Sequence, residues 1–384
     1  MNKMKKICYI TTVSLTLDMF VLEAAKYIHQ NTDWDITFVC NNDDEFAKRL
    51  PEYIKFHPIK MERGISITGV KAMLNMIKFF KEQKFDLIQY STPNASLYAA
   101  IAGKIAGVPV RLYCQWGMAF VAFSGIKRKI FKILEKTTCA LSTCIEPDSD
   151  SNLRFSHMEG LYPKTMGKVI WRGSACGVNL NKFDITSKDE YRTEIRNKYD
   201  IPKDSFIFGY VGRITRDKGI NELFEAFKKL TENNKSVYLL MIGHEEKDKN
   251  VDQDLYEWSK RNEYVIYTGF TNVVEKYMAS MDCYVLPSYR EGFGMGVIEA
   301  EAMGTPVIVT NIPGPIDAMQ ENETGLIVEK KDVKCLYEAM KKIYTNRRLH
   351  NRLQSNARKY VEENFEQSCF FSEMLVDRKQ LLKN

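Results

Sequence analysis

The sequence predicts an α/β protein with two doubly wound, Rossmann-like domains that face each other across a cleft. Three observations support this prediction. The chain has 384 residues, which is about the length of two ordinary domains. Short apolar runs alternate with amphipathic stretches, a pattern typical of a parallel sheet covered by helices on both faces. The alternation runs through both halves of the chain, and the polar segment 179–204 separates them.

In the first half, apolar runs bounded by polar residues predict strands, and apolar residues at spacings of three and four predict the helices between them. Met73, Ile77 and Phe80 form one such helical pattern. The predicted strands are Lys6–Thr11, Asp35–Cys40, Asp86–Ser91, Val110–Gln115 and Ala140–Ile145.

The second half repeats the pattern after residue 204. Behind its first strand, Ile220, Leu223 and Phe224 fall on one face of a helix, as expected for a helix packed on a sheet. The predicted strands are Phe206–Gly212, Val237–Gly243, Val265–Gly269, Cys283–Ser288, Val307–Thr310 and Gly325–Val328.

These patterns define four segments. Residues 1–178 are predicted to form the N-terminal domain and residues 205–362 the C-terminal domain. Residues 179–204 are predicted to be a polar linker with one short charged helix. Residues 363–384 are predicted to form a C-terminal helix, and one possibility is that this helix crosses back to the N-terminal domain. Ligands of doubly wound sheets bind at the carboxyl ends of the strands, so we expect the site in the cleft between the domains.

Composition narrows the class of protein. With 45% hydrophobic and 27% charged residues the chain is globular, and its net charge of +6 fits anionic ligands or a membrane surface without requiring either. The cysteines include no Cys-x-x-Cys pair, which indicates reduced, buried thiols in a cytoplasmic protein. The apolar start ends at Thr11, too early for a signal peptide, and no run approaches the about 18 apolar residues that span a bilayer.

Glu291 and Glu299 stand eight positions apart in E-G-F-G-M-G-V-I-E, directly after the apolar run C-Y-V-L-P-S. A strand, a glycine-rich turn and a helix bring backbone N–H groups close to a ligand. Glu299 suits the hydroxyls of a ribose, and Glu291 those of a transferred sugar. The alternative, a plain helix start with a favourable first-turn carboxylate, leaves the glycines unexplained. The amides of the turn belong to Gly292, Phe293, Gly294 and Met295.

Arg213 and Lys218 flank a short loop in F-G-Y-V-G-R-I-T-R-D-K-G, where a predicted strand ends at Gly212 and a helix follows. Two cations beside a helix N-terminus neutralise a diphosphate, because a guanidinium grips two oxygens and an ammonium acts as a point charge. The alternative is a solvated loop with ordinary surface charges. Together with the Glu291 motif, this loop predicts a nucleotide-sugar site.

The motifs resemble those of GT-B glycosyltransferases of the retaining glycosyltransferase family 4, and in particular the bacterial capsule and exopolysaccharide enzymes. The resemblance covers nearly the whole chain, and it implies that the second domain binds the donor and the first the acceptor. It also implies catalytic roles for Arg213, Lys218 and Glu291. The family's diphosphate-binding V-G-R…K-G is matched by Val211, Gly212, Arg213, Lys218 and Gly219, and its E-x7-E by Glu291 and Glu299.

The chain departs from this family pattern at three places. Where members have a Gly-Gly loop after the first strand, this chain has T-T-V-S-L-T. The hydroxyls of Thr12, Ser14 and Thr16 are candidates to replace that loop, and a plain connecting loop is the equal alternative. Trp116 stands where many members carry a histidine that faces the sugar, so Gln115 and Trp116 are the candidate pocket residues, and no catalytic histidine is assigned. Asp317 stands where a glutamate is common.

The sequence gives no support for a bound metal. Asp148-Ser-Asp150 and Asp252-Gln-Asp254 lie in polar segments and are interpreted as chance surface acids, and the histidines show no metal spacing. His244 is interpreted as a loop residue. We therefore expect no metal and no cofactor beyond the nucleotide-sugar substrate.

Residues 127–136, K-R-K-I-F-K-I-L-E-K, predict a basic amphipathic helix. In one interpretation its apolar side chains pack on the sheet. In the other they contact an anionic membrane at its periphery, helped by neighbouring apolar residues. No nucleic-acid-binding module is present. The apolar residues concerned are Ile130, Phe131, Ile133 and Leu134, with Phe120, Val121 and Phe123 nearby.

The sequence therefore predicts a retaining, metal-independent glycosyltransferase. It would move a sugar from a nucleoside diphosphate sugar to a glycan acceptor in bacterial surface polysaccharide synthesis. UDP is the favoured nucleotide and GDP the second choice. The resemblance to capsule and exopolysaccharide enzymes implies that the acceptor is linked to a lipid. Two alternatives stay open: a nucleotide-sugar epimerase on the same scaffold, and a catalytically silent binding subunit of a transferase complex, which Trp116 keeps open. The expected location is the cytoplasm, with the inner face of the cell membrane as an option.

Overall fold

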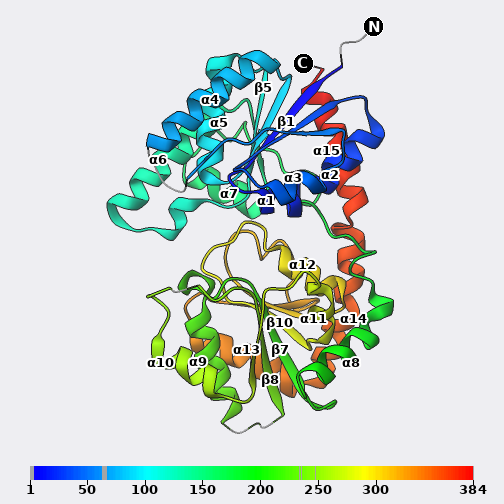
Figure 1. The fold of residues 1–384 in the computed structure, drawn as a ribbon. Coiled ribbons are helices and arrows are strands. Elements are labelled where there is room, and N and C mark those ends of the chain that lie inside the picture. The colour runs from blue at the N-terminus through cyan, green and yellow to red at the C-terminus, as the bar shows by residue number, and fades with distance from the viewer. Residues whose placement is uncertain (1–3, 63–66, 233, 235, 247, 384) are drawn as a thin grey trace. The chain divides into compact units, whose positions relative to one another are not determined.

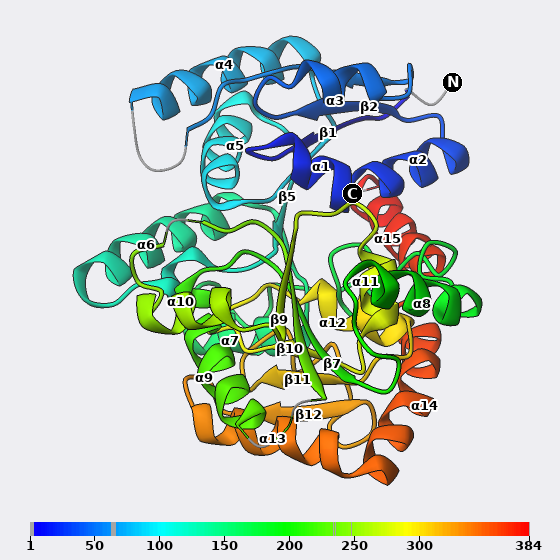
Figure 2. The same ribbon diagram turned by 60° about the horizontal axis from the view of Figure 1, so that its bottom comes forward.

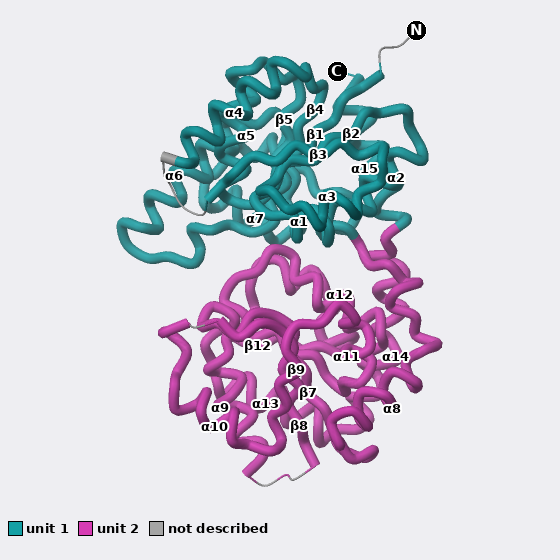
Figure 3. The backbone as a smooth tube through the Cα atoms, viewed as in Figure 1, with its two compact units in different colours: residues 1–176, 368–384 teal, residues 177–367 magenta. Residues whose placement is uncertain are grey.

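A computed structural model describes residues 4–62, 67–232, 234, 236–246 and 248–383. The chain divides into two compact units (Figure 3). Unit 1 contains residues 1–176 and 368–384, and unit 2 contains residues 177–367. Among the described residues, no helix combines the length and the apolar character that a membrane crossing needs.

Unit 1 is built on a six-stranded sheet in the order β3-β2-β1-β4-β5-β6. Every neighbouring pair is parallel, so helices must connect the strands and cover both faces. The strands are β1 (Lys6–Ile10), β2 (Asp35–Val39), β3 (Ile54–Phe56), β4 (Leu87–Tyr90), β5 (Val110–Gln115) and β6 (Cys144–Pro147).

The helices of unit 1 lie on the two faces of this sheet (Figure 1). One face is covered by α4, α5 and α6, whose apolar side chains join the buried cluster around Ile88 and Tyr90. On the other face α2 and α15 meet through Tyr27 and Phe371, whose ring centroids are 5.7 Å apart. The helices are α1 (Ser14–Phe20), α2 (Leu22–Asn31), α3 (Asp44–Arg49), α4 (Ile67–Gln83), α5 (Pro93–Ala106), α6 (Gly125–Leu141), α7 (Asp150–Met158) and α15 (Gln367–Leu381), with the 3₁₀ turn η1 (Ala119–Ala122).

Unit 2 repeats the arrangement with the sheet order β12-β11-β10-β7-β8-β9. Its pairs are again parallel, and each strand overlaps a predicted one. In each unit the chain runs outward from the first strand, then returns to build the other half of the sheet. The strands are β7 (Phe206–Val211), β8 (Val237–Ile242), β9 (Val265–Gly269), β10 (Cys283–Leu286), β11 (Val307–Thr310) and β12 (Gly325–Val328).

Two apolar clusters hold the helices of unit 2 on its sheet. One joins α9 and α13 to one face, and the other joins α8, α11, α12 and α14 to the opposite face (Figure 2). The helices are α8 (Lys188–Lys198), α9 (Ile220–Thr231), α10 (Gln253–Arg261), α11 (Val274–Ser280), α12 (Met295–Ala302), α13 (Val333–Thr345) and α14 (Arg347–Asn364), with the 3₁₀ turns η2 (Ile185–Ser187) and η3 (Arg216–Lys218).

The structure therefore has the predicted α/β class with two Rossmann-like sheets, and it corrects two details of unit 1. The strand β3 was missed, because three residues show too little alternation to be recognised. The predicted strand Ala140–Ile145 is wrong in its first half, because α6 continues to Leu141 and β6 begins at Cys144.

The segment 179–204, predicted as a linker, lies within unit 2. Its helix α8 packs against α11, and Ile195 is buried in the unit 2 core. Arg192 and Arg196 also bind the carboxylate of Asp282, at 2.8 and 3.0 Å. A polar sequence hides these contacts because the arginines bury their stems while their charged ends find a partner.

Helix α15 is anchored in unit 1 by a buried arginine. Arg378 keeps only 1% of its side chain exposed, and its Nη1 donates to Glu146 at 2.5 Å and to Asp377 at 2.9 Å. Its Nε and Nη2 donate to the Gln89 side chain at 3.3 and 3.2 Å. The single guanidinium thus pairs with two carboxylates and an amide, and the Lys168 ammonium gives Asp377 a second partner at 2.6 Å.

We expect Arg378→Met to lower the free energy of unfolding of unit 1 by about 3 kcal/mol, because the two carboxylates lose their buried counter-ion. Thermal unfolding followed by circular dichroism measures the effect. Lys379→Met, at an exposed position of the same helix, is the control and should change little. Equal melting temperatures for both variants would contradict the anchoring role.

Candidate functional site

The strand order places the candidate site of unit 2 at the carboxyl edge of its sheet. β7 and β10 lie side by side at the point where the chain order reverses. Ligands of doubly wound sheets bind outside this point. The loop from β7 to α9 carries Arg213 and Lys218, and the loop from β10 to α12 carries Glu291.

Lys218 and Glu291, 73 residues apart in the chain, meet between these loops. The Lys218 Nζ lies 2.6 Å from the Glu291 Oε1. The side chains keep 18% and 14% exposure, so little water screens their attraction. The Ser288 hydroxyl donates to the same Oε1 at 2.6 Å. A ligand with a phosphate beside hydroxyl groups can exchange this internal ion pair for one bond to each partner.

Arg213 has a different partner in this structure. Its Nη1 lies 3.3 and 3.1 Å from the two carboxylate oxygens of Glu246, and these side chains are 44% and 43% exposed. Exposed ion pairs contribute little free energy. The guanidinium can therefore leave Glu246 for a more highly charged anion at low cost.

The glycines of the two loops serve close packing as well as the ligand approach that the sequence predicts. Gly219 has φ +71°, and a Cβ at this position would stand 2.0 Å from the Pro287 carbonyl oxygen. A Cβ at Gly296 would stand 2.5 Å from the Tyr284 hydroxyl. Gly294, with φ +88°, precedes the first turn of α12. Side chains at these positions would push the loops and α12 away from the sheet.

Glu299 lies on α12 and is partly buried. Burial raises the pKa of its carboxyl to about 7, Lys182 opposes the increase, and Glu275 adds to it. The Lys182 Nζ lies 3.8 Å from the Glu275 Oε2. Near neutral pH, Glu299 is therefore poised between its protonated and ionised forms, and either form accepts hydrogen bonds from hydroxyl groups.

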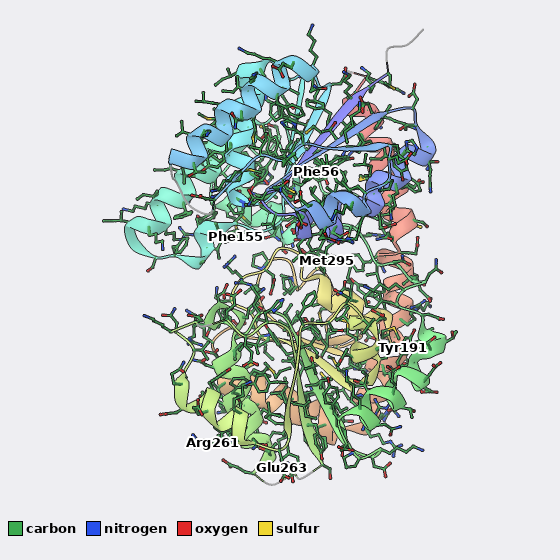
Figure 4. The ribbon with its side chains drawn as sticks, in the orientation of Figure 1. Phe56, Phe155, Tyr191, Arg261, Glu263 and Met295 are labelled. Carbon is green, nitrogen blue, oxygen red and sulfur yellow. The ribbon has the colours of Figure 1, made fainter. Side chains whose placement is uncertain are left out.

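The remaining turn residues have separate roles. The Phe293 ring is buried at 2% exposure and packs edge-on against Phe365, with centroids 5.3 Å apart. Only the main chain of Phe293 is thus available to a ligand. Met295, labelled in Figure 4, is partly exposed and begins α12. Gly212 follows β7 directly, and its N–H donates to the Ile242 carbonyl at 2.9 Å.

In unit 1, Thr12 and Ser14 follow β1 at the carboxyl edge of the sheet. The Thr12 hydroxyl lies 2.8 Å from that of Thr92, and the Thr12 N–H donates to the same oxygen at 3.1 Å. The Ser14 hydroxyl donates to Asp43 at 2.5 Å, and this bond leads the effects that lower the pKa of that carboxyl. Both hydroxyls thus have partners within unit 1.

Trp116 follows β5 at the same carboxyl edge of unit 1. Its ring packs against Phe20 with centroids 5.7 Å apart, and the residue is partly exposed. The preceding Gln115 is fully buried and donates to Glu135 at 2.7 Å. Trp116 is therefore the one of these two neighbours that remains open to a ligand.

The acidic strings have structural partners. Asp252 caps α10 by accepting hydrogen bonds from the N–H groups of Asp254 and Leu255 at 3.0 and 3.1 Å. The interpretation of Asp148 as a surface acid is wrong, because it is 2% exposed and accepts from the Asn152 amide at 2.8 Å. In the described part of the chain, no three His, Cys, Asp or Glu side chains are arranged to hold a metal ion.

His244 does lie in the loop after β8, as predicted, and it has an aromatic neighbour. Its ring stacks on Phe270, with centroids 4.9 Å apart and planes 7° apart. Phe270 follows β9 and is 52% exposed. The pair forms a flat, partly open surface at the same carboxyl edge as Arg213.

Helix α6 exposes part of its apolar side chains. Ile126, Ile130 and Ile133 are 77%, 47% and 62% exposed. Phe131 instead packs on the core of unit 1, so the sequence interpretation that packs all of these residues on the sheet is wrong for the isoleucines. Phe120 is fully buried and adds nothing to the surface. We call Ile126, Ile130 and Ile133, with the exposed Lys127, Lys129 and Lys136, the α6 surface.

Sequence reasoning missed the side chains that connect the two loops of unit 2. Tyr289 donates to Glu222 at 2.7 Å, and Arg290 lies 3.0 Å from Asp217. The sequence feature that could have indicated these contacts is the presence of both acidic and basic residues in the segments T-R-D-K and S-Y-R-E. The sheet order was needed to show that these two segments meet.

Comparisons with known proteins agree with this fold. Residues 191–360 match the model of the glycosyl transferases group 1, and residues 6–149 match that of the glycosyl transferase 4-like proteins. The crystal structure of Anabaena HepE in complex with UDP and glucose has a TM-score of 0.79 at 17% identity. That match covers 98% of this chain and 100% of HepE.

Curated relatives match along most of the chain. The capsular polysaccharide biosynthesis glycosyltransferase CapM of Staphylococcus aureus is 31% identical over 374 residues, which is 97% of this chain and 96% of CapM. The UDP-Gal:alpha-D-GlcNAc-diphosphoundecaprenol alpha-1,3-galactosyltransferase of Escherichia coli is 24% identical, over 87% of this chain and 86% of its own. The chain therefore belongs to the family 4-type glycosyltransferases of capsule and exopolysaccharide synthesis, with the GT-B fold.

Proposed function

We propose that the protein is a retaining glycosyltransferase that moves a sugar from a UDP-sugar to a lipid-linked glycan without a metal ion. The ion pair of Lys218 and Glu291 carries this proposal, because it sets a cation for phosphate and an acid for hydroxyls 2.6 Å apart at the carboxyl edge of unit 2. The name of the Escherichia coli relative, a UDP-Gal transferase acting on a diphosphoundecaprenol-linked sugar, supports the choice of donor and acceptor.

In the proposed complex, the donor diphosphate replaces the acidic partners of the two cations. Lys218 turns from Glu291 to a phosphate oxygen, and Arg213 leaves the exposed carboxylate of Glu246. Glu291, still held by Ser288, then accepts from the sugar hydroxyls. Glu299 accepts from the ribose, and His244 with Phe270 offers a flat face for the base.

In this proposal, catalysis depends on the positive charges of Lys218 and Arg213, which lie beside the diphosphate before the reaction begins. As the bond from the anomeric carbon to the phosphate oxygen breaks, negative charge grows on the diphosphate. Fixed cations stabilise that charge more in the transition state than in the ground state, which lowers the barrier. The acceptor oxygen bonds to the anomeric carbon on the face that the diphosphate leaves, and its proton passes to the departing phosphate oxygen, so the anomeric configuration is retained. The two cations take the role that a metal would otherwise fill.

The α6 surface fits an acceptor held in a membrane. Its isoleucines form an apolar strip, and three exposed lysines flank it. A helix of this composition lies in the plane of an anionic bilayer, with the apolar strip in the acyl region and the lysines at the lipid phosphates. Arg128 and Lys132 are already paired with Glu159, at 2.7 and 2.6 Å, so the exposed lysines would carry the lipid contact.

The first prediction tests the donor site. We expect Lys218→Ala and Glu299→Ala each to lower transfer at least about tenfold, roughly 1.4 kcal/mol of transition-state stabilisation, and to weaken the thermal stabilisation that UDP gives. A panel of UDP- and GDP-sugars with wild-type protein identifies the donor for this assay. The control is Lys334→Ala, at an exposed position of α13. Near-normal rates in both site variants would refute the assignment, and conversion of the free UDP-sugar to its epimer would favour the epimerase.

The second prediction concerns pH. A folded pKa of about 7 for Glu299 exceeds the roughly 4.3 of an unfolded glutamate. Between these values the unfolded chain has lost the proton that the folded chain keeps, so rising pH favours unfolding, and above pH 7 the penalty is constant.

We therefore compare the melting temperature of Glu299→Gln with that of the wild type at two pH values. The difference, variant minus wild type, should be larger at pH 7.5 than at pH 5 by roughly 3–8 °C. Melting curves at constant ionic strength measure this difference. Glu338→Gln, at an exposed position of α13, is the control. A difference between Glu299→Gln and wild type that does not change with pH would refute the raised pKa.

The third prediction tests the α6 surface. We expect the double variant Ile130→Asp, Ile133→Asp to bind vesicles of phosphatidylcholine with about one third phosphatidylglycerol at least tenfold more weakly than wild type, because two aliphatic side chains leave the acyl region. Co-sedimentation measures the binding. Val376→Asp, which replaces a 51% exposed aliphatic residue on α15, is the control. Equal binding by all three proteins, or equal binding to vesicles of phosphatidylcholine alone, would refute the proposal.

A further inference from the structure

The two donor-site loops of unit 2 are joined by contacts that involve neither Lys218 nor Glu291. The Tyr289 N–H donates to the Asp217 carbonyl at 2.9 Å. The Gly219 backbone approaches the Pro287 carbonyl so closely that a Cβ would stand 2.0 Å from it. The residue before Lys218 and the residue two positions before Glu291 are thus bonded directly to each other.

A buried side-chain cluster stands behind this backbone contact. Glu222, in the first turn of α9, is 7% exposed. The Tyr289 hydroxyl lies 2.7 Å from both of its carboxylate oxygens, and the Arg216 Nη1 lies 2.9 and 2.8 Å from them. The Arg216 guanidinium also lies 5.1 Å above the Tyr289 ring. One carboxylate therefore ties a residue of each loop to the start of α9.

The surroundings of the cluster keep the Tyr289 hydroxyl protonated and its neighbouring charges paired. Burial raises the pKa of the Tyr289 phenol, and the hydrogen bond to Glu222 raises it further, so the hydroxyl remains a donor at neutral pH. The Lys331 ammonium lies 4.8 Å from the Tyr289 ring. Arg290 pairs with Asp217 at 3.0 Å, and the Thr215 hydroxyl donates to the same carboxylate at 2.7 Å.

We propose that Tyr289, acting through Glu222 and Arg216, is a positioning residue that sets the separation of Lys218 and Glu291 for the donor. This inference rests on the proposed function, because it assumes that Lys218 binds the donor diphosphate. When the donor parts Lys218 from Glu291, the loops lose their shortest mutual ion pair. The bonds of Tyr289 then keep the ammonium at the distance that the diphosphate requires, and misplacement by about 1 Å is costly at such a site.

The removal of one hydroxyl tests this role. Tyr289→Phe keeps the ring under Arg216 and Lys331 and leaves Glu222 bonded to Arg216. We expect the dissociation constant for UDP, measured by titration calorimetry, to rise about fivefold, while the melting temperature of the free protein changes by less than about 2 °C. Tyr113→Phe removes the same kind of bond in unit 1, where the Tyr113 hydroxyl donates to Glu135 at 2.8 Å, and should leave UDP binding unchanged.

A double-mutant cycle with Lys218→Met shows whether Tyr289 acts through the lysine. If it does, Tyr289→Phe has no further effect on UDP affinity once Lys218 is removed. Equal losses from Tyr289→Phe in both backgrounds would overturn the positioning role in favour of a general structural one. So would a loss in Lys218→Met with none in Tyr289→Phe.

The same cycle separates this inference from the proposed function. If Lys218→Met binds UDP as tightly as wild type, or if wild type binds neither UDP nor GDP, the donor site itself is refuted and the positioning role falls with it. A strong loss in Lys218→Met, together with coupling to Tyr289→Phe, supports both.

Discussion

The contact between Lys218 and Glu291 is the interaction on which the rest of the site depends. A lysine and a glutamate that are mostly shielded from water attract each other strongly. The same two groups can bind a ligand that carries both an anionic group and hydroxyl groups. In the free protein they neutralise each other, so neither charge is left without a counter-ion. A phosphate for one and hydroxyl groups for the other can take over both roles at once, which few ligands other than a nucleotide-sugar provide.

This contact exists because two parallel strands at the reversal point of the sheet release their loops at the same edge. Glycine at 219 lets the loops approach until backbone meets backbone, and Tyr289 adds a bond from one loop to the helix that follows the other. The site is thus rigid at its base, where hydrogen bonds are buried. It is adaptable at its rim, where Arg213 has only an exposed partner.

Unit 1 uses the same sheet order with different chemistry at its carboxyl edge. Thr12 follows β1 and Trp116 follows β5, with β4 between these strands, and the neighbouring Gln115 is buried and bonded within the unit. Helix α6 is one of the places in unit 1 where large apolar side chains are exposed, and the proposed lipid contact would account for both its isoleucines and the lysines beside them.

Local sequence patterns were sufficient for most of the fold. The alternation of apolar runs located all of the unit 2 strands, and it failed for β3, whose three residues are too few for a pattern, and for the start of β6, where apolar helix and strand residues follow each other. Motif chemistry predicted Arg213, Lys218, Glu291 and Glu299 as site residues, and the structure brings Lys218 and Glu291 together. It missed Tyr289 and Glu222, because neither is unusual within its own segment.

By itself, the sequence determined which segments become strands and helices, and which ionisable groups follow the strands, because these properties depend on neighbours a few residues away. Only the tertiary structure decided that Lys218 meets Glu291 while Arg213 meets Glu246. It also decided that Phe120 is buried while Ile126 is exposed. Strand order brings together two residues that are 73 positions apart, and packing in α6 draws Phe131 onto the core while it leaves the neighbouring isoleucines exposed. Neither is encoded in local periodicity.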